Sequence, residues 1–137
     1  MPIKILVGRF YTELWNQWDD AAVEQVLDSD FAFRGSMGTE TSGLDGWRAY
    51  RDAIRHGSPD FHNEVVDLVA DGDEAAARLR YTGHHRGLLA GIPATGRAFE
   101  YAGAAFFASA GGKLTSAWAL GDLDGLRRQL EPEAAPR

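Results

Sequence analysis

The sequence predicts an α+β fold, in which a curved antiparallel or mixed sheet wraps around N-terminal helices and encloses a pocket. Two observations predict it. Apolar residues recur at helical spacing in the first part of the chain, and from Phe61 onward the pattern changes to consecutive strands. The length of 137 residues is typical of one domain. We therefore expect a single domain over residues 1–130 and a disordered tail over residues 131–137.

Three helices are expected before the strands begin. Asp19 and Asp20 interrupt the first helix and are expected to cap a second, shorter one, Ala21–Leu27. A third helix should begin near Asp45, its expected N-cap, and place Gly57 at its C′ position. The first helix carries an apolar stripe made of Ile3, Leu6, Val7, Phe10 and Leu14.

The strands follow from turn sequences. A short strand, Phe31–Phe33, leads into a glycine-rich loop over residues 35–43. Further along the chain, turns at residues 71–73, 91–96 and 111–112 separate longer apolar segments. The expected strands are Phe61–Ala70, Ala75–Gly87, Arg97–Ala110 and Lys113–Asp122, with a closing helix at Leu123–Leu130.

Composition excludes several classes of function. The formal net charge of −6 repels phosphate and anionic lipid, so we expect neither a nucleic-acid partner nor a membrane. The absence of cysteine excludes disulfides and thiolate chemistry and is consistent with a reducing cytoplasm, where we expect this protein. The N-terminal segment has no long uninterrupted apolar run, and we expect no signal peptide.

Neither a metal nor a cofactor is expected. His84 and His85 are adjacent on an expected strand, so their side chains point to opposite faces and cannot bind one metal ion together. The segment Gly91–Arg97 has glycines at P-loop spacing but lacks the lysine and hydroxyl residue that such a loop needs. A turn is the better interpretation of this segment.

Strand alternation selects the candidate site residues. Leu79, Tyr81 and His85 share one face of their strand, and Arg78 and Arg80 mark the opposite face as exposed. We therefore expect the first three side chains to face the core or a cavity.

The last strand gives a second candidate. Strand alternation places Leu114, Ser116, Trp118, Leu120 and Asp122 on one face. One imidazole and one carboxylate are then expected to face the same apolar space. An inward carboxylate has a raised pKa, which suits a general base. From these residues alone, a cap of the closing helix is the favoured interpretation of Asp122, and a buried packing residue that of His85.

The aromatic residues are seven Phe, four Tyr and four Trp. We expect them mainly to form a pocket wall. The residues expected to line the substrate pocket are Trp15, Trp18, Trp47, Tyr81, Trp118, Leu120, Phe33 and Met37.

Three segments resemble a known family, the SnoaL-like polyketide cyclases, also called ester cyclases. Phe10–Asn16 is similar to their first helix. Gly83-His84-His85-Arg86-Gly87, followed by Gly91–Arg97, is similar to their glycine–threonine–histidine–any–glycine and glycine–isoleucine–proline–any–threonine–glycine–arginine stretch. Gly112-Lys113-Leu114 and the residues up to Leu130 resemble their C-terminal signature. The resemblance covers nearly the whole chain apart from the tail.

The resemblance implies the cone-shaped α+β barrel of the nuclear transport factor 2-like superfamily, as a homodimer or homotetramer. It implies ring closure of a hydrophobic, polyketide-like substrate by intramolecular aldol condensation, without a cofactor. Asp122 matches the position of a general base and His85 that of a nearby pocket histidine. The chain departs from the pattern at Ala117, where many relatives carry a histidine or an acid, and at His84, which replaces a threonine.

Two rival functions fit the same pocket. The first is another reaction, such as epoxide hydrolysis or an isomerisation. The second is a non-catalytic small-molecule binding or accessory protein. A shared fold does not decide among them, because function depends on the site.

Overall fold

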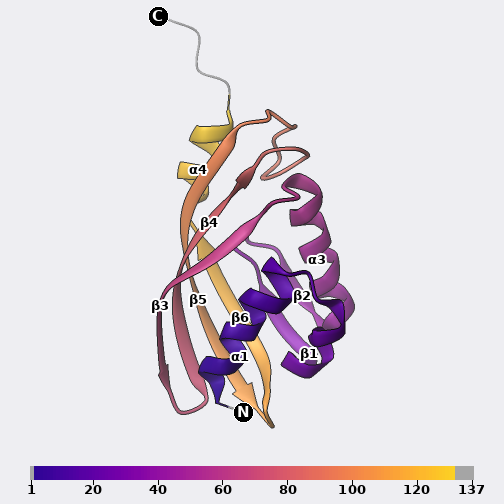
Figure 1. Ribbon diagram of the computed structural model, residues 1–137, viewed down its shortest axis with the longest axis vertical. Coiled ribbons are helices and arrows are strands. Elements are labelled where there is room, and N and C mark those ends of the chain that lie inside the picture. The colour runs from indigo at the N-terminus through magenta and orange to yellow at the C-terminus, as the bar shows by residue number, and fades with distance from the viewer. Residues whose placement is uncertain (1, 132–137) are drawn as a thin grey trace, which may run out of the picture.

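The computed structural model describes residues 2–131 as helices packed against one six-stranded sheet (Figure 1). The expected tail, residues 131–137, lies outside the described residues except for Glu131. The helical elements are α1 (Ile3–Arg9), its π-helical continuation η1 (Phe10–Asn16), the short 3-10 turn η2 (Asp20–Ala22), α2 (Val23–Val26), α3 (Gly43–Gly57) and α4 (Leu123–Leu130).

The strands are β1 (Leu27–Arg34), β2 (Glu40–Ser42), β3 (His62–Asp71), β4 (Glu74–His84), β5 (Ala98–Ala110) and β6 (Lys113–Gly121). Their order in the sheet is β2-β1-β6-β5-β4-β3. All pairs are antiparallel except β1 with β6, which run parallel. The sheet is therefore mixed, and the expected α+β fold is confirmed.

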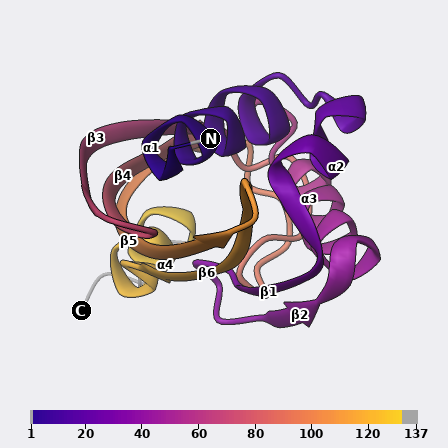
Figure 2. The same ribbon diagram turned by 90° about the horizontal axis from the view of Figure 1, so that it is seen from below.

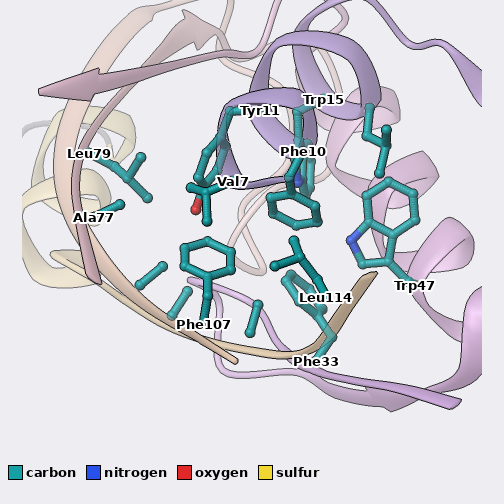
Figure 3. Packing of buried hydrophobic residues seen from close by; sticks show 14 of the residues in the cluster. Val7, Phe10, Tyr11, Trp15, Phe33, Trp47, Ala77, Leu79, Phe107 and Leu114 are labelled. Carbon is teal, nitrogen blue, oxygen red and sulfur yellow. The ribbon is translucent and has the colours of Figure 1, made fainter. Parts of the chain in front are cut away.

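The sheet is strongly curved, and α1 lies across its concave side while α3 stands beside β1 (Figure 2). This arrangement is the cone-shaped fold that the resemblance implies. The apolar stripe of α1 and η1 points into the cone, where Leu6, Val7 and Leu14 are fully buried and Phe10 almost so. Aromatic rings from the helices and the sheet meet there, as Phe10 and Phe107 do with ring centroids 5.7 Å apart (Figure 3).

Two helix starts differ from the expectation. Asp19 and Asp20 form no side-chain cap; Asp20 instead binds two arginines of α3, and only the residues from Val23 to Val26 form an α-helix. Helix α3 begins at Gly43, so Asp45 lies in its first turn. Gly57 is the last helical residue, and its lack of a side chain is required because a Cβ there would lie 2.6 Å from Leu88 O.

A bulge in β6 overturns the expected alternation of the last strand. The register with β5 shifts between Ala108–Ser116 and Ser109–Leu114, so the strand holds one extra residue at this point. Beyond the bulge the inward positions are Ala117 and Ala119, which are buried. Trp118 and Leu120 are 42% and 49% exposed, so the prediction that they face the pocket was wrong.

Candidate active site

A small cavity lies inside the cone, between η1, α3 and the sheet. Its volume is about 20 Å³, which is room for about one water molecule. Seven of the fifteen aromatic residues line this cavity, and their rings leave little open space between them. The expectation that the aromatic residues mainly form a pocket wall stays a prediction. The cavity is lined by Phe10, Tyr11, Trp15, Phe33, Ser36, Tyr50, Ile54, Phe61, Asn63, Tyr81 and Ala119.

Tyrosine hydroxyls are the main polar groups of this interior. The Tyr50 hydroxyl accepts a hydrogen bond from Met37 N–H at 3.2 Å, and the Ser36 and Tyr101 hydroxyl oxygens are 3.2 Å apart. Burial raises the pKa of Tyr11 and Tyr81 far above the usual value for a phenol. Burial also raises the pKa of Tyr50, although hydrogen bonds from Met37 and Ser36 act in the opposite direction. These phenols are thus neutral hydrogen-bond donors near neutral pH.

Glycines make room for these rings. A Cβ at Gly35 would lie 2.6 Å from Cε1 of Tyr50, so only glycine lets that ring occupy its position. A Cβ at Gly121 would lie 3.0 Å from Cβ of Ser36 and 3.1 Å from Cε2 of Tyr101. The loop after β1 and the end of β6 are consequently held close to the polar side of the cavity.

A larger cavity of about 130 Å³ forms the mouth of the cone. It shares Trp15, Ile54 and Phe61 with the inner cavity, so these three side chains lie between the two spaces. Asn16 fixes one rim, because its side chain exchanges two hydrogen bonds of 2.9 Å with the backbone of Asn63. The remaining lining residues are Trp18, Arg55, Ser58, Pro59, Asp60 and His62.

The carboxylate of Asp60 at the mouth already has hydrogen-bond partners within the protein. It accepts hydrogen bonds from the His84 backbone N–H at 2.8 Å and from the Ser58 hydroxyl at 3.1 Å, and it lies 2.6 Å from Nδ1 of His84. Burial alone would raise the pKa of Asp60, but these hydrogen bonds outweigh it and lower the pKa. His84, which departs from the family pattern, thus joins the end of β4 to the loop before β3.

A third space is an open apolar groove of about 480 Å³ between α3, the segment around β2 and the loop after β4. Tyr50 and Ile54 lie between this groove and the inner cavity, since both side chains line both spaces. Met37, an expected substrate-contacting residue, lines this groove rather than the inner cavity.

Asp122 lies at the end of β6 and caps α4. Its Oδ1 accepts a hydrogen bond of 2.9 Å from Gly125 N–H, and the side chain is exposed. It lines neither the inner cavity nor the mouth. The structure therefore does not bring Asp122 and His85 together across one open cavity. A role of Asp122 as a base stays a prediction.

His85 is fully buried, as are Leu79 and Tyr81, but it lies one residue beyond β4, which ends at His84 instead of the expected Gly87. Both ring nitrogens have partners. Nε2 lies 2.9 Å from Ile92 O, and Nδ1 lies 2.9 Å from the Thr95 hydroxyl and accepts from Thr95 N–H at 3.2 Å. The ring therefore fixes the loop between β4 and β5. A catalytic role of His85 stays a prediction.

The other expected pocket residues divide between cavity and core. Trp15, Phe33 and Tyr81 line the inner cavity, and Trp18 lines the mouth. Trp47 is fully buried against Trp15 and Phe10 and lines no cavity described here. Sequence reasoning did not select Ser36, Tyr50, Tyr101, Arg55 or Asp60 as site residues. Only the position of Tyr50 on the same helix face as Trp47 offered a signal.

Residues 2–131 contain neither a cluster of metal ligands nor a membrane-spanning helix. No three His, Asp or Glu side chains in this part of the chain gather closely enough to hold a metal ion. None of its helices is both long and apolar enough to cross a membrane.

Comparison with known proteins places this arrangement in a family. Residues 5–130 match the family model of the SnoaL-like polyketide cyclases. No curated protein matches the chain. Among solved structures, TsrD from Streptomyces laurentii is 29% identical with a TM-score of 0.82, over 93% of this chain and 93% of that one.

A SnoaL-like polyketide cyclase from Agrobacterium tumefaciens is 21% identical with a TM-score of 0.82, over 96% of this chain and 99% of that one. This second likeness concerns the fold alone. The family match, by contrast, spans the helices, the sheet and α4 together. This chain therefore belongs to the SnoaL-like polyketide cyclase family.

Proposed function

We propose that this protein is a cyclase-like enzyme that closes a ring in a hydrophobic, carbonyl-rich substrate by an intramolecular aldol reaction. The observation that carries the proposal is the set of neutral tyrosine hydroxyls around the inner cavity, from Tyr11, Tyr50 and Tyr81. Removing a proton next to a carbonyl group places negative charge on its oxygen. Donors fixed in an apolar interior stabilise that charge strongly.

The substrate enters through the mouth of the cone. The inner cavity holds about 20 Å³, so the half-buried Phe61 ring has to move before a substrate carbonyl can reach Tyr81. Tyr50 and Tyr81 then donate hydrogen bonds to the enolate oxygen. We assign this part to tyrosines rather than to His85, because both nitrogens of that ring already have partners.

The candidate base is Asp122, on the strength of the family resemblance and of its place next to Gly121, which borders Ser36 and Tyr101. To accept a proton, its carboxylate has to give up the Gly125 hydrogen bond or use its second oxygen. The enolate carbon then attacks a second carbonyl of the same molecule, forming the ring bond, and the resulting alkoxide takes up the proton. Loss of water from this β-hydroxy ketone gives the cyclic enone.

A second function is favoured by one specific observation. None of the residues lining the inner cavity carries a carboxylate, and the inward positions of β6 beyond its bulge are Ala117 and Ala119. A non-catalytic binding or accessory protein would keep such a cavity without a base. This alternative predicts that ligand binds and that no product forms.

The test is a ring-closure assay with a hydrophobic aryl diketone that can form a six-membered cyclic enone, followed by product absorbance and mass. Tyr81→Phe should lower kcat by about 10²–10³-fold with little change in KM, because one oxyanion donor is removed. Ser109→Ala is the control, since it removes a hydroxyl of β5 that lies near Asp73 O and does not line the inner cavity. Binding of the diketone without any product would establish the alternative function instead.

A further inference from the structure

We propose that the mouth of the cone binds the carboxylate of a one-ring substrate, and that Arg55 is the residue that recognises it. The inference rests on the proposed function, because it names the class of substrate for that reaction: a monocyclic carboxylic acid that also carries the two carbonyl groups that ring closure joins. Three observations support it: the charge of Arg55, which is unpaired within residues 2–131; the contacts that hold Arg55 and Trp18 in place; and the volume of the mouth cavity.

Arg55 brings an uncompensated charge into this cavity. Its guanidinium lies over the Trp18 ring, 4.1 Å from the centroid, and the side chain lines the mouth. Within residues 2–131 it forms no ion pair, whereas Arg48 and Arg51 on the same helix both bind Asp20 at 3.0 Å. A guanidinium held by its flat face on an indole keeps its N–H groups free for a ligand.

The indole beneath Arg55 is itself held in place. Trp18 has φ of +57°, a left-handed backbone conformation that costs energy in any residue other than glycine. Arg51, which is only 3% exposed, lies over the same ring at 4.0 Å and is tied to Asp20. Contacts on α3 therefore maintain the strained loop, so the Trp18–Arg55 pair is formed before any ligand arrives.

The carboxylate already present in the cavity does not neutralise Arg55. The Asp60 carboxylate accepts hydrogen bonds from the Ser58 hydroxyl and the His84 backbone N–H, and it also contacts Nδ1 of His84. A ligand carboxylate can instead meet the guanidinium with two parallel N–H···O bonds. Because the protein carries a net charge of −6, its long-range field repels anions, and any preference for an acid has to arise locally.

The volume of the mouth sets the size of the ligand. It is about 130 Å³, close to the roughly 150 Å³ of an engineered protein cavity that binds benzene. Trp15 and Phe61 provide aromatic walls for such a ring. With the carboxylate on Arg55, a carbonyl on the opposite side of the ring points toward the inner cavity and its tyrosines.

The test compares two probes of the same shape, para-acetylbenzoate and para-acetylbenzamide, by calorimetry and by quenching of tryptophan fluorescence. The acid should bind the unmodified protein about tenfold more tightly than the amide, as expected for a charge-assisted hydrogen bond. Raising the salt concentration should reduce this ratio, because it screens a partly exposed ion pair. Equal dissociation constants, or no binding of either probe, would overturn the proposal.

Arg55→Gln should remove the preference for the acid while leaving binding of the amide within about twofold of the unmodified protein. Arg128→Gln is the matched control, since it removes the same charge from an exposed position on α4. A preference that survives in Arg55→Gln would assign the anion to another residue. The salt titration uses the unmodified protein, so the test stands even if Arg55→Gln folds poorly.

The preference for the acid is measured independently of catalysis. Binding is measured without turnover, so a preference for the acid can hold in a protein that forms no ring. If ring closure fails while the acid preference is present, the proposed reaction is wrong and the acid site stands. If the aryl diketone is cyclised while the acid and the amide bind with equal affinity, the acid site is wrong and the reaction stands.

Discussion

The ring of Tyr81 on β4 lies against the bare α-carbon of Gly103 on β5. A Cβ at position 103 would lie 2.9 Å from the Tyr81 hydroxyl oxygen and 2.9 Å from Leu120 O. The second distance involves backbone, which cannot easily move. The position of a tyrosine that lines the inner cavity thus depends on a glycine in the neighbouring strand.

Replacing this glycine should displace the tyrosine. We expect Gly103→Ala to lower the free energy of unfolding by about 1–3 kcal/mol, the usual cost of forcing an extra methyl group into a packed site. Gly8→Ala is the control, because nothing lies within 4 Å of a Cβ there and alanine favours a helix. It should raise the free energy by about 0.5–1 kcal/mol. Urea denaturation measures both, and equal stability of the two variants would contradict the expectation.

The sequence predicted some of these relationships and missed others for identifiable reasons. Alternation along β4 correctly predicted that Leu79 and Tyr81 are buried. The prediction holds because the pairing of β4 with β5 has no register shift over this stretch. The same reasoning failed for Trp118 and Leu120, because one extra residue in β6 reverses the alternation. The types of side chain in β6 do not predict such a bulge. Strand β2 was also missed, since three residues within a polar loop carry no apolar pattern.

The polar side of the cavity could not be predicted from spacing. Ser36, Tyr50 and Tyr101 come from a loop, a helix and a strand that are far apart in the chain, and only the closed cone brings them together. Likewise, Asp20 was expected to cap a helix, because the local pattern is typical of a cap. The arginines that bind it instead lie about thirty residues further along.

The two roles of Asp122 can be separated by substitution. Asparagine caps helices about as well as aspartate, so Asp122→Asn should keep the Gly125 hydrogen bond and nearly all of the stability. Because an asparagine amide cannot accept the proton, Asp122→Asn should lower kcat by about 10²–10⁴-fold in the diketone assay if Asp122 is the base. Asp122→Ala should additionally lower the free energy of unfolding by about 0.5–2 kcal/mol. Full activity in the asparagine variant would leave Asp122 as a cap only.

His85 should act mainly on the stability of the loop between β4 and β5. His85→Phe removes the partners of Ile92 O and Thr95 N–H, so we expect a loss of about 1–3 kcal/mol and faster proteolysis within residues 86–97. His62→Phe is a control, since that imidazole is exposed on β3. Denaturation and timed proteolysis provide the measurements. A His85→Phe protein that is inactive but as stable as the unmodified chain would instead support direct participation in the reaction.

Acid should weaken the attachment of η2 to α3. Hydrogen bonds from Arg48 and then Arg51 lower the pKa of Asp20 in the folded protein. A lowered folded-state pKa stabilises the fold at pH values above the ordinary value, 3.8 for this group, and that contribution is lost as pH falls through the folded-state pKa. Asp20→Asn should therefore lower Tm at pH 7 and have little effect near pH 2. Identical differences in Tm at both pH values would contradict this coupling.

The outer face of the sheet should join two copies of the chain. Phe106, Trp118 and Leu120 are exposed on the side of β5 and β6 away from α1, with the first two rings 6.2 Å apart. Exposed aromatic groups gathered in one place are typical of an interface. We propose that the protein is a homodimer or homotetramer through this face, so Leu120→Glu should produce monomers in sedimentation equilibrium. Ile5→Glu places the same charge at an exposed apolar position of α1 and should leave the assembly intact. A monomeric unmodified protein at micromolar concentration, or dissociation by Ile5→Glu alone, would rule out this face as the interface.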